Sequence, residues 1–117
     1  MLYGCLRPEA ATGVGSVLQM GRDMHWVAIF DNSQAMPEVR AKYEPDHFEY
    51  LRAHRTEILL AGGLREGPGH PFGGGLWILA VSSKERAVEL VESDPYFLHS
   101  RRNYKILQWG KRFRTSR

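Results

Sequence analysis

Short runs of β-branched and aromatic residues, bounded by turn-forming residues, recur along the chain and predict strands. The first run, HWVAIFD, is apolar at every position between its polar ends. The second, EILLAGGLR, contains two adjacent glycines, which indicate a bulge or the close approach of another group. The predicted strands span residues 25–31, 57–65, 76–81 and 103–109.

Helical patterns lie between these strands. Residues 38–43 predict a short helical segment, Pro45 interrupts it, and a firmer helix covers 46–55, since proline is tolerated at the first helical position. The residues expected on its core side are Tyr43, Phe48 and Leu51, and those expected in water are Glu49, Arg52 and Arg55.

A second helical region follows Ser82-Ser83, which supply an N-cap for a helix over 84–92. Its expected core face is Ala87, Leu90 and Val91. Asp94-Pro95 ends that helix, and residues 96–100 predict one further turn.

The resulting order, β-α-β-β-α-β, is that of the split, ferredoxin-like arrangement. This α+β fold places four antiparallel strands in one sheet and the helices on one face. The segment EGPGHPFGGG, residues 66–75, joins the second and third strands and is longer than a tight hairpin turn requires.

Both faces of the predicted sheet are apolar. In the first strand Trp26, Ala28 and Phe30 alternate with Val27 and Ile29, so apolar residues point to both faces. The third strand, LWILAV, likewise has apolar residues at every position. A bare apolar sheet face exceeds the patch that soluble monomers usually expose. A second copy packed sheet to sheet about a two-fold axis is the expected cover, and the alternative is that residues 1–23 fold back over the sheet.

Charge excludes some function classes. The 117 residues carry a formal net charge of +3, but residues 24–113 hold twelve Lys and Arg against eleven Asp and Glu. The excess therefore lies mostly in the basic tail, 114–117, and a near-neutral body argues against nucleic-acid binding. No apolar run approaches the ~18–20 residues needed to span a bilayer.

The N-terminal residues 1–23 have no sustained period and are expected to be a flexible extension of a domain over 24–113. They do not resemble a secretory signal, and Met24 is a candidate natural start. Cys5 is the single cysteine, so no internal disulfide can form. Together these features favour the cytoplasm.

His47 is expected in the first turn of the helix 46–55, where the helix dipole disfavours the charged imidazolium. A neutral ring there can accept a proton and so act as a general base. The alternative is a polar first-turn residue that happens to be histidine.

Asp94 has two interpretations of its own. Asp before Pro commonly forms the N-cap and first residue of a short helix. In the functional alternative the carboxylate lies beside His47, fixes its tautomer and supports the imidazolium as it forms.

His70 lies in the 66–75 loop and is a candidate substrate contact if that loop is a lid, the alternative being a solvated loop histidine. The His, Cys, Asp and Glu spacings match no metal motif, so no metal and no cofactor is assigned.

Three segments resemble the YciI-like, or YCII-related, protein family. VRAKYEPDHFEYL, residues 39–51, resembles its first helix, in which an Arg precedes a Pro-x-His. ILLAGG, residues 58–63, resembles its second strand, and ESDPYF, residues 92–97, resembles the Asp-Pro-Tyr/Phe motif after its second helix. The resemblance covers about residues 24–113.

The resemblance implies a dimeric α/β barrel of two ferredoxin-like subunits, with a site where a His and an Asp meet. These map to His47 and Asp94, while Arg40 and Tyr96 fall in the matching motifs as ligand contacts. A few relatives act in the breakdown of aromatic compounds, including dehydrochlorination of a hydroxyquinone-type substrate. The leader and the GPGHPFGGG loop depart from the family, so the substrate does not simply transfer.

Two functions of different class remain. One is a cofactor-independent enzyme in which His47 takes a proton from a small, cyclic or aromatic metabolite, oriented by Asp94, for isomerisation or elimination. The other is a non-catalytic homodimer whose pocket only holds a small molecule. RNA binding ranks behind both, because the third strand, GGGLWILAV, has no basic residue and one ring.

Overall fold

The computed structural model describes residues 24–110. The predicted extension 1–23, Cys5 and the basic tail 114–117 lie outside the described residues. The elements in chain order are β1 (His25–Asp31), α2 (Met36–Ala53), β2 (Ile58–Leu64), β3 (Gly74–Ala80), α3 (Lys84–Glu92), α4 (Pro95–Ser100) and β4 (Tyr104–Trp109).

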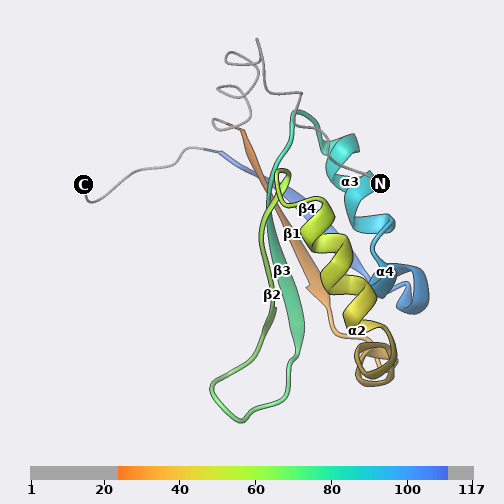
Figure 1. The fold of residues 1–117 in the computed structure, drawn as a ribbon. Coiled ribbons are helices and arrows are strands. Elements are labelled where there is room, and N and C mark those ends of the chain that lie inside the picture. Colours follow the sequence, from red (N-terminus) through yellow and green to blue (C-terminus); the bar gives the residue numbers. More distant parts are fainter. Residues whose placement is uncertain (1–23, 111–117) are drawn as a thin grey trace.

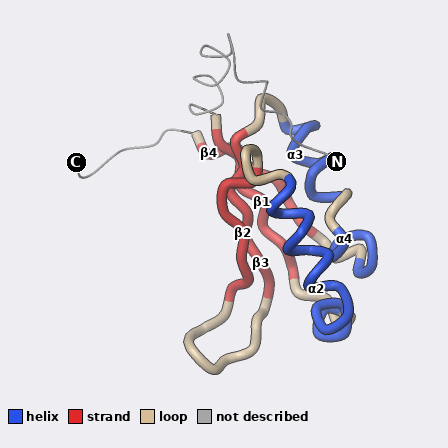
Figure 2. Tube along the Cα trace, in the orientation of Figure 1, coloured by secondary structure: helices blue, strands red, loops and turns tan. Residues whose placement is uncertain are grey.

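The four strands form one sheet in the order β2-β3-β1-β4, and each neighbouring pair is antiparallel. The helices α2, α3 and α4 all lie on one face of this sheet (Figure 1). The predicted ferredoxin-like fold is therefore confirmed. Figure 2 shows the loop between β2 and β3 extending well beyond the paired strands.

The core lies between the sheet and the helices. Its buried members on the strands include Ala28, Phe30, Trp77, Leu79 and Ile106. Helix α3 contributes Ala87, Leu90 and Val91, which is the predicted core face. The predicted N-cap is also confirmed, since the Arg86 backbone N–H donates to Ser83 Oγ at 3.1 Å.

Helix α2 is one helix of 18 residues, so the predicted interruption at Pro45 is wrong. Pro37, which precedes the predicted segment 38–43, occupies the start of the helix, and Pro45 lies inside it. An internal proline removes one helical hydrogen bond and costs about 3 kcal/mol or more. The ribbon changes direction between the N-terminal turns and the rest of α2 (Figure 1), as expected at a proline. Packing on both sides of Pro45 offsets this cost.

The buried stripe of α2 also differs from the prediction. Phe48 is 49% exposed, whereas Met36, Val39 and His47 are buried and Leu51 is half-buried. His47 takes the buried position at this turn of the helix, and Phe48, the next residue around the helix, therefore faces outward. The predicted solvent residues Glu49, Arg52 and Arg55 are exposed.

No helix within residues 24–110 has both the length and the hydropathy to cross a membrane.

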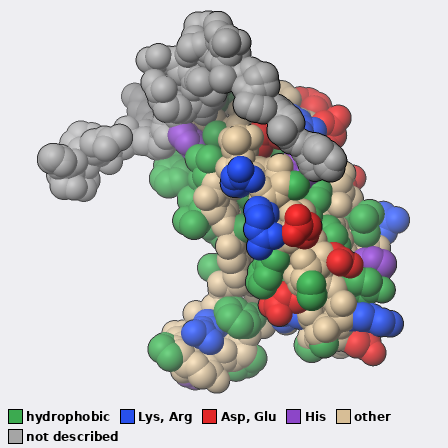
Figure 3. Space-filling view, viewed as in Figure 1, with side chains coloured by type: hydrophobic (Ala, Val, Ile, Leu, Met, Phe, Trp, Pro, Cys, Tyr) green, Lys and Arg blue, Asp and Glu red, His purple; other side chains and the backbone are tan. Residues whose placement is uncertain are grey.

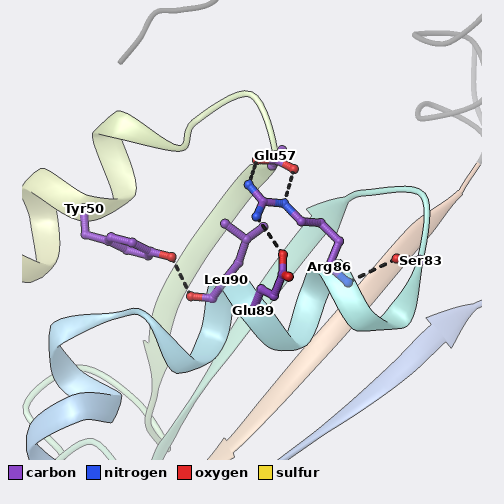
Figure 4. Close-up of polar contacts among 6 residues, drawn as sticks. All are labelled: Tyr50, Glu57, Ser83, Arg86, Glu89 and Leu90. Atoms are coloured by element: carbon purple, nitrogen blue, oxygen red, sulfur yellow. Dashed lines mark hydrogen bonds and ion pairs between the residues drawn. The ribbon is translucent and has the colours of Figure 1, made fainter. Parts of the chain in front are cut away.

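Polar contacts tie α2 and the start of β2 to α3 (Figure 4). The Tyr50 hydroxyl donates to the Leu90 carbonyl at 2.7 Å. Arg86 donates through Nε and Nη2 to both carboxylate oxygens of Glu57, each at 2.8 Å. This two-point contact raises the pKa of Arg86, and burial raises the pKa of Tyr50. The contacts hold the C-terminal half of α2 in place.

The face of the sheet opposite the helices has no described element over it (Figure 1). Directly paired residues lie on the same side of a sheet, so the strand registers define this open sheet face. Its apolar side chains are Val27, Ile29, Leu60, Leu64, Leu76, Ile78, Ala80, Leu107 and Trp109, and His25 and Lys105 lie on the same side. Leu60 is 64% exposed and Leu107 is 49% exposed. The predicted two-sided apolar pattern is therefore present.

Tyr104 carries a prediction about alkaline stability. Its hydroxyl donates to Glu92 Oε2 at 2.6 Å, and burial together with this bond raises the pKa of Tyr104 from 10.0 to about 12. The folded protein thus keeps a proton that the unfolded chain loses, so the stabilisation is complete below pH 10.0 and is lost as the pH rises through about 12. Urea unfolding measured across this pH interval should show that the difference in free energy of unfolding between wild type and Tyr104→Phe decreases as the pH rises. A constant difference would contradict the assignment.

Candidate active site

His47 of α2 and Asp94, the residue before α4, are brought together in the fold. The distance from His47 Nδ1 to Asp94 Oδ1 is 2.7 Å. His47 is 7% exposed and Asp94 is 1% exposed, so the contact is almost fully removed from water. Burying a carboxylate is expensive unless a partner accepts its charge, and His47 is that hydrogen-bonding partner.

The expected effect of the helix dipole on His47 is wrong. Because α2 begins at Met36, His47 lies in the helix interior, and the dipole acts only within the first turn. The carboxylate of Asp94 sets the tautomer instead: it accepts the Nδ1–H, which leaves the lone pair on Nε2. Among residues 24–110 the Nε2 atom has no hydrogen-bond partner, so it is the nitrogen available to a ligand.

Asp94 occupies an N-cap position without capping the helix. Its backbone is extended, with φ −71° and ψ 133°, and Pro95 follows as the first residue of α4. An N-cap aspartate normally accepts a backbone N–H of the first turn. Here the side chain makes no such bond, and its Oδ1 is committed to His47. The local structure thus gives up a capping bond in favour of the histidine contact.

Tyr96 fixes the plane of the imidazole. Its ring stacks on that of His47 with centroids 3.7 Å apart and an interplanar angle of 6°. Burial raises the pKa of Tyr96, and the nearby Glu44 carboxylate adds to this effect. Tyr96 therefore stays a neutral phenol that covers one face of His47.

A cavity of about 300 Å³ opens between α2 and the β2 side of the sheet. Its volume is at the small end for ligand sites and suits a ligand of about one ring. The residues that line it are Arg40, Glu44, His47, Phe48, Leu51, Ala61, Gly62, Gly63, Phe72, Gly75, Trp77, Tyr96 and Arg102. Of the five site residues expected from sequence, the cavity or its hydrogen bonds bring together Arg40, His47, Asp94 and Tyr96.

Small residues line one wall of this cavity. Gly63 and Gly75 are cross-strand partners at the cavity wall, and Ala61 lies opposite Trp77. The register shift in β2 falls between Ile58 and Leu60, so the glycines are not a bulge. The other expectation holds, because the Phe72 ring approaches Gly63 closely.

Gly63 carries a prediction about the cavity. A Cβ at Gly63 would lie 2.7 Å from Cδ1 of Phe72, so Gly63→Ala must displace this aromatic wall. Ligand affinity should fall by about tenfold, the effect of losing one well-packed aromatic contact. Gly73→Ala is the control, because a Cβ at Gly73 would meet nothing within 4 Å. Unchanged affinity in Gly63→Ala, measured by calorimetry, would remove Phe72 from the site.

Two arginines lie at the cavity, and they differ in setting. Arg40, anticipated from sequence, is half-buried and donates from Nη2 to Asn32 Oδ1 at 3.2 Å. Arg102 was not anticipated: it is 6% exposed, and its guanidinium carbon lies 4.2 Å from the centre of the Phe30 ring. Burial and Arg40 lower the pKa of Arg102, while Asp94 acts in the opposite direction. Nothing in the pair Arg101-Arg102 indicates which of the two is buried.

His70 lies apart from these residues. It is exposed in the β2–β3 loop and lines a different hollow, of about 430 Å³, together with Leu64, Arg65, Glu66, Pro71 and Gly73. Figure 3 shows hydrophobic and basic side chains sharing the tip of this loop. The described structure does not bring His70 to His47. No three His, Cys, Asp or Glu side chains of residues 24–110 form a metal-binding group.

Comparisons with known proteins agree with this fold. A model of the YCII-related domain matches residues 24–110. Similar solved structures include 5-chloro-2-hydroxyhydroquinone dehydrochlorinase from Burkholderia phenoliruptrix in complex with 2,5-dihydroxybenzoquinone, with a TM-score of 0.59 and 21% identity over 74% of this chain and 92% of that chain. A protein from Agrobacterium tumefaciens gives a TM-score of 0.43 and 21% identity over 80% and 96% of the two chains. No curated protein matches.

Proposed function

This chain belongs to the YCII-related family, and we propose that it is a cofactor-independent enzyme in which His47 and Asp94 perform acid/base chemistry. The substrate is a small, aromatic-derived metabolite, and the reaction is an elimination such as dehydrochlorination, or an isomerisation. Arg40 and Tyr96 are proposed as substrate contacts, because both line the cavity beside His47. His70 can join them only if the β2–β3 loop, or that of a second subunit, closes.

The proposed step begins with the free lone pair on His47 Nε2, which removes a proton from a carbon made acidic by a conjugated oxygen. In an elimination the electron pair of the broken C–H bond forms a double bond, and chloride leaves with the electrons of the C–Cl bond. In an isomerisation the same proton returns to another carbon. Asp94 accepts the Nδ1–H throughout and stabilises the imidazolium while it exists.

The observation that carries the proposal is the 2.7 Å contact between His47 Nδ1 and a 1%-exposed Asp94, with His47 in the cavity wall. A purely structural histidine could bond one carboxylate equally well. The stacked Tyr96 and the cavity of about 300 Å³ add an oriented ring and room for a ligand beside it. Base, orienting group and cavity thus occur together.

We also propose that the protein works as a homodimer in the cytoplasm. The open sheet face supports the dimer, since nine apolar residues meet there without a described cover. The single cysteine of the sequence supports a reducing compartment.

The test is turnover of chlorinated hydroxyhydroquinones, beginning with 5-chloro-2-hydroxyhydroquinone, on which the structurally similar dehydrochlorinase acts. Chloride release measured with an ion-selective electrode, with quinone absorbance in parallel, should exceed the rate in buffer. A companion isomerisation assay follows deuterium uptake from heavy water by unsaturated lactones. Tight binding with no conversion in either assay would contradict the enzyme and favour the non-catalytic binding dimer.

A further inference from the structure

Arg102 is a buried cation that the described structure does not neutralise by contact. It is 6% exposed, and its Nε is fully buried without a hydrogen-bond partner among residues 24–110. We propose that Arg102 makes the cavity an anion site, which binds a ligand through an ionised oxygen of a carboxylate, phenolate or enolate. This inference rests on the proposed function only in using the same cavity.

The cost of burying an arginine argues for a ligand. A charged group removed from water is strongly destabilising unless it is paired and hydrogen-bonded. Arg102 obtains one partial compensation from the Phe30 ring at 4.2 Å and a weaker one from the Tyr96 ring at 5.7 Å. Neither ring accepts the in-plane N–H groups of the guanidinium, and within residues 24–110 no other group accepts a hydrogen bond from the Arg102 side chain.

No carboxylate among residues 24–110 is hydrogen-bonded to Arg102, although the Oδ2 atom of nearby Asp94 is itself buried without a hydrogen-bond partner. Asp94 is close enough to influence Arg102 through space, but its Oδ1 accepts from His47 and no hydrogen bond joins it to the guanidinium. Glu44 is the one carboxylate among the cavity-lining residues, and it is exposed. Arg40 adds a second positive charge to the same wall. An anion entering this cavity therefore meets two guanidinium groups, of which only Arg102 is buried.

The surrounding backbone holds Arg102 toward the cavity. Arg101 has φ 53°, in the left-handed region where glycine is usual, and this turn sends the next side chain inward over Phe30. Across the cavity wall, a Cβ at Gly75 would lie 3.7 Å from Arg102 Nη1. Gly75, which lines the cavity, therefore lies beside the end of the guanidinium.

An oxyanion at Arg102 also completes the proposed chemistry. When His47 Nε2 removes a proton from carbon, the electron pair moves to the conjugated oxygen and gives an enolate. Arg102 hydrogen-bonds this oxygen, and His47 holds the proton, so charge and protons balance. Both side chains contact Tyr96, which places the base and the cation at the same part of the cavity.

The test compares ligands that differ in charge but little in shape. Calorimetry should show wild type binding benzoate and 4-nitrophenolate at least tenfold more tightly than neutral benzamide, the effect of one charged hydrogen bond. Preference for benzoate assigns a carboxylate ligand, and preference for 4-nitrophenolate assigns a phenolate or enolate. Equal binding of all three probes, or no binding at millimolar concentration, overturns the proposal.

Variants assign the effect to Arg102. Arg102→Met keeps the stem over Phe30 and should reduce the anion preference by about tenfold or more, whereas Arg102→Lys should retain most of it. If circular dichroism shows that Arg102→Met does not fold, Arg102→Gln takes its place. The control Arg52→Met removes an exposed arginine and should bind as wild type does. Unchanged preference in folded Arg102→Met or Arg102→Gln overturns the proposal.

A further variant distinguishes failure of the anion site from failure of the proposed acid/base function. His47→Asn should lose turnover yet keep the preference for anions, because it leaves Arg102 in place. If Arg102→Met binds anions as wild type does while His47→Asn is inactive, the anion site is contradicted and the acid/base function is not. If His47→Asn is fully active while Arg102→Met loses the preference for anionic probes, the acid/base function is contradicted and the anion site is not.

Discussion

Replacing His47 with Asn is expected to lower turnover by about 10²–10⁴-fold while the fold is retained. The amide nitrogen of Asn takes the place of Nδ1, so it can still donate to Asp94 Oδ1 and the buried carboxylate keeps a partner. What disappears is Nε2, the atom proposed to take the proton. The measurement is kcat on any substrate that wild type converts, with circular dichroism and thermal melting to confirm folding.

Two further variants sharpen this expectation. Asp94→Asn permits the wrong tautomer of His47 and should also reduce kcat by about 10²-fold or more. His99→Asn is the matched control, because His99 is exposed on α4 and stacks on Tyr43 away from the cavity lining. Full activity in folded His47→Asn would remove the histidine from the mechanism, whatever the control shows.

Replacing Ile78 with Lys is expected to dissociate the proposed homodimer. Ile78 lies on β3 in the open sheet face, with Val27 beside it on β1 and Leu60 on β2. A buried unpaired ammonium costs several kcal/mol, and each 1.4 kcal/mol is tenfold in Kd, so the dissociation constant should rise by about 100-fold or more. In a free subunit the same lysine lies in water, so the fold should survive.

Sedimentation equilibrium of wild type and Ile78→Lys measures this directly. Leu98→Lys is the matched control, because Leu98 is also an exposed apolar residue, 51% accessible, but lies on α4 away from the open sheet face. It should leave the dimer intact. A wild-type protein that stays monomeric at high micromolar concentration would contradict the proposed assembly.

The fold was accessible from sequence because its signals are local. Runs of apolar residues marked the strands, and Ser83 marked the start of α3. The failure at Pro45 has a physical cause: the rule that proline ends a helix describes an isolated chain. In the protein, the burial of Met36 on one side and the Tyr50–Leu90 bond on the other hold α2 together across it. Tertiary contacts of this kind cannot be read from a window of sequence.

The site was accessible only in part for the same reason. The resemblance pointed to His47 and Asp94, and their meeting depends on long-range packing that no spacing rule supplies. Arg102 was missed because its burial follows from the left-handed turn at Arg101, a conformation that arginine rarely adopts. Phe72 was missed because a loop ring finds its place only against Gly63. His70, singled out for its loop, lies elsewhere in the subunit.

The tautomer of His47 is the most direct measure of whether Nε2 can serve as the base. Long-range ¹H–¹⁵N correlation spectra of wild type in mildly alkaline buffer, assigned with His47→Asn, report which ring nitrogen carries the proton. The geometry predicts a protonated Nδ1, bonded to Asp94, and a bare Nε2. A neutral ring with its proton on Nε2 would contradict the account, because that nitrogen could not accept one from a substrate.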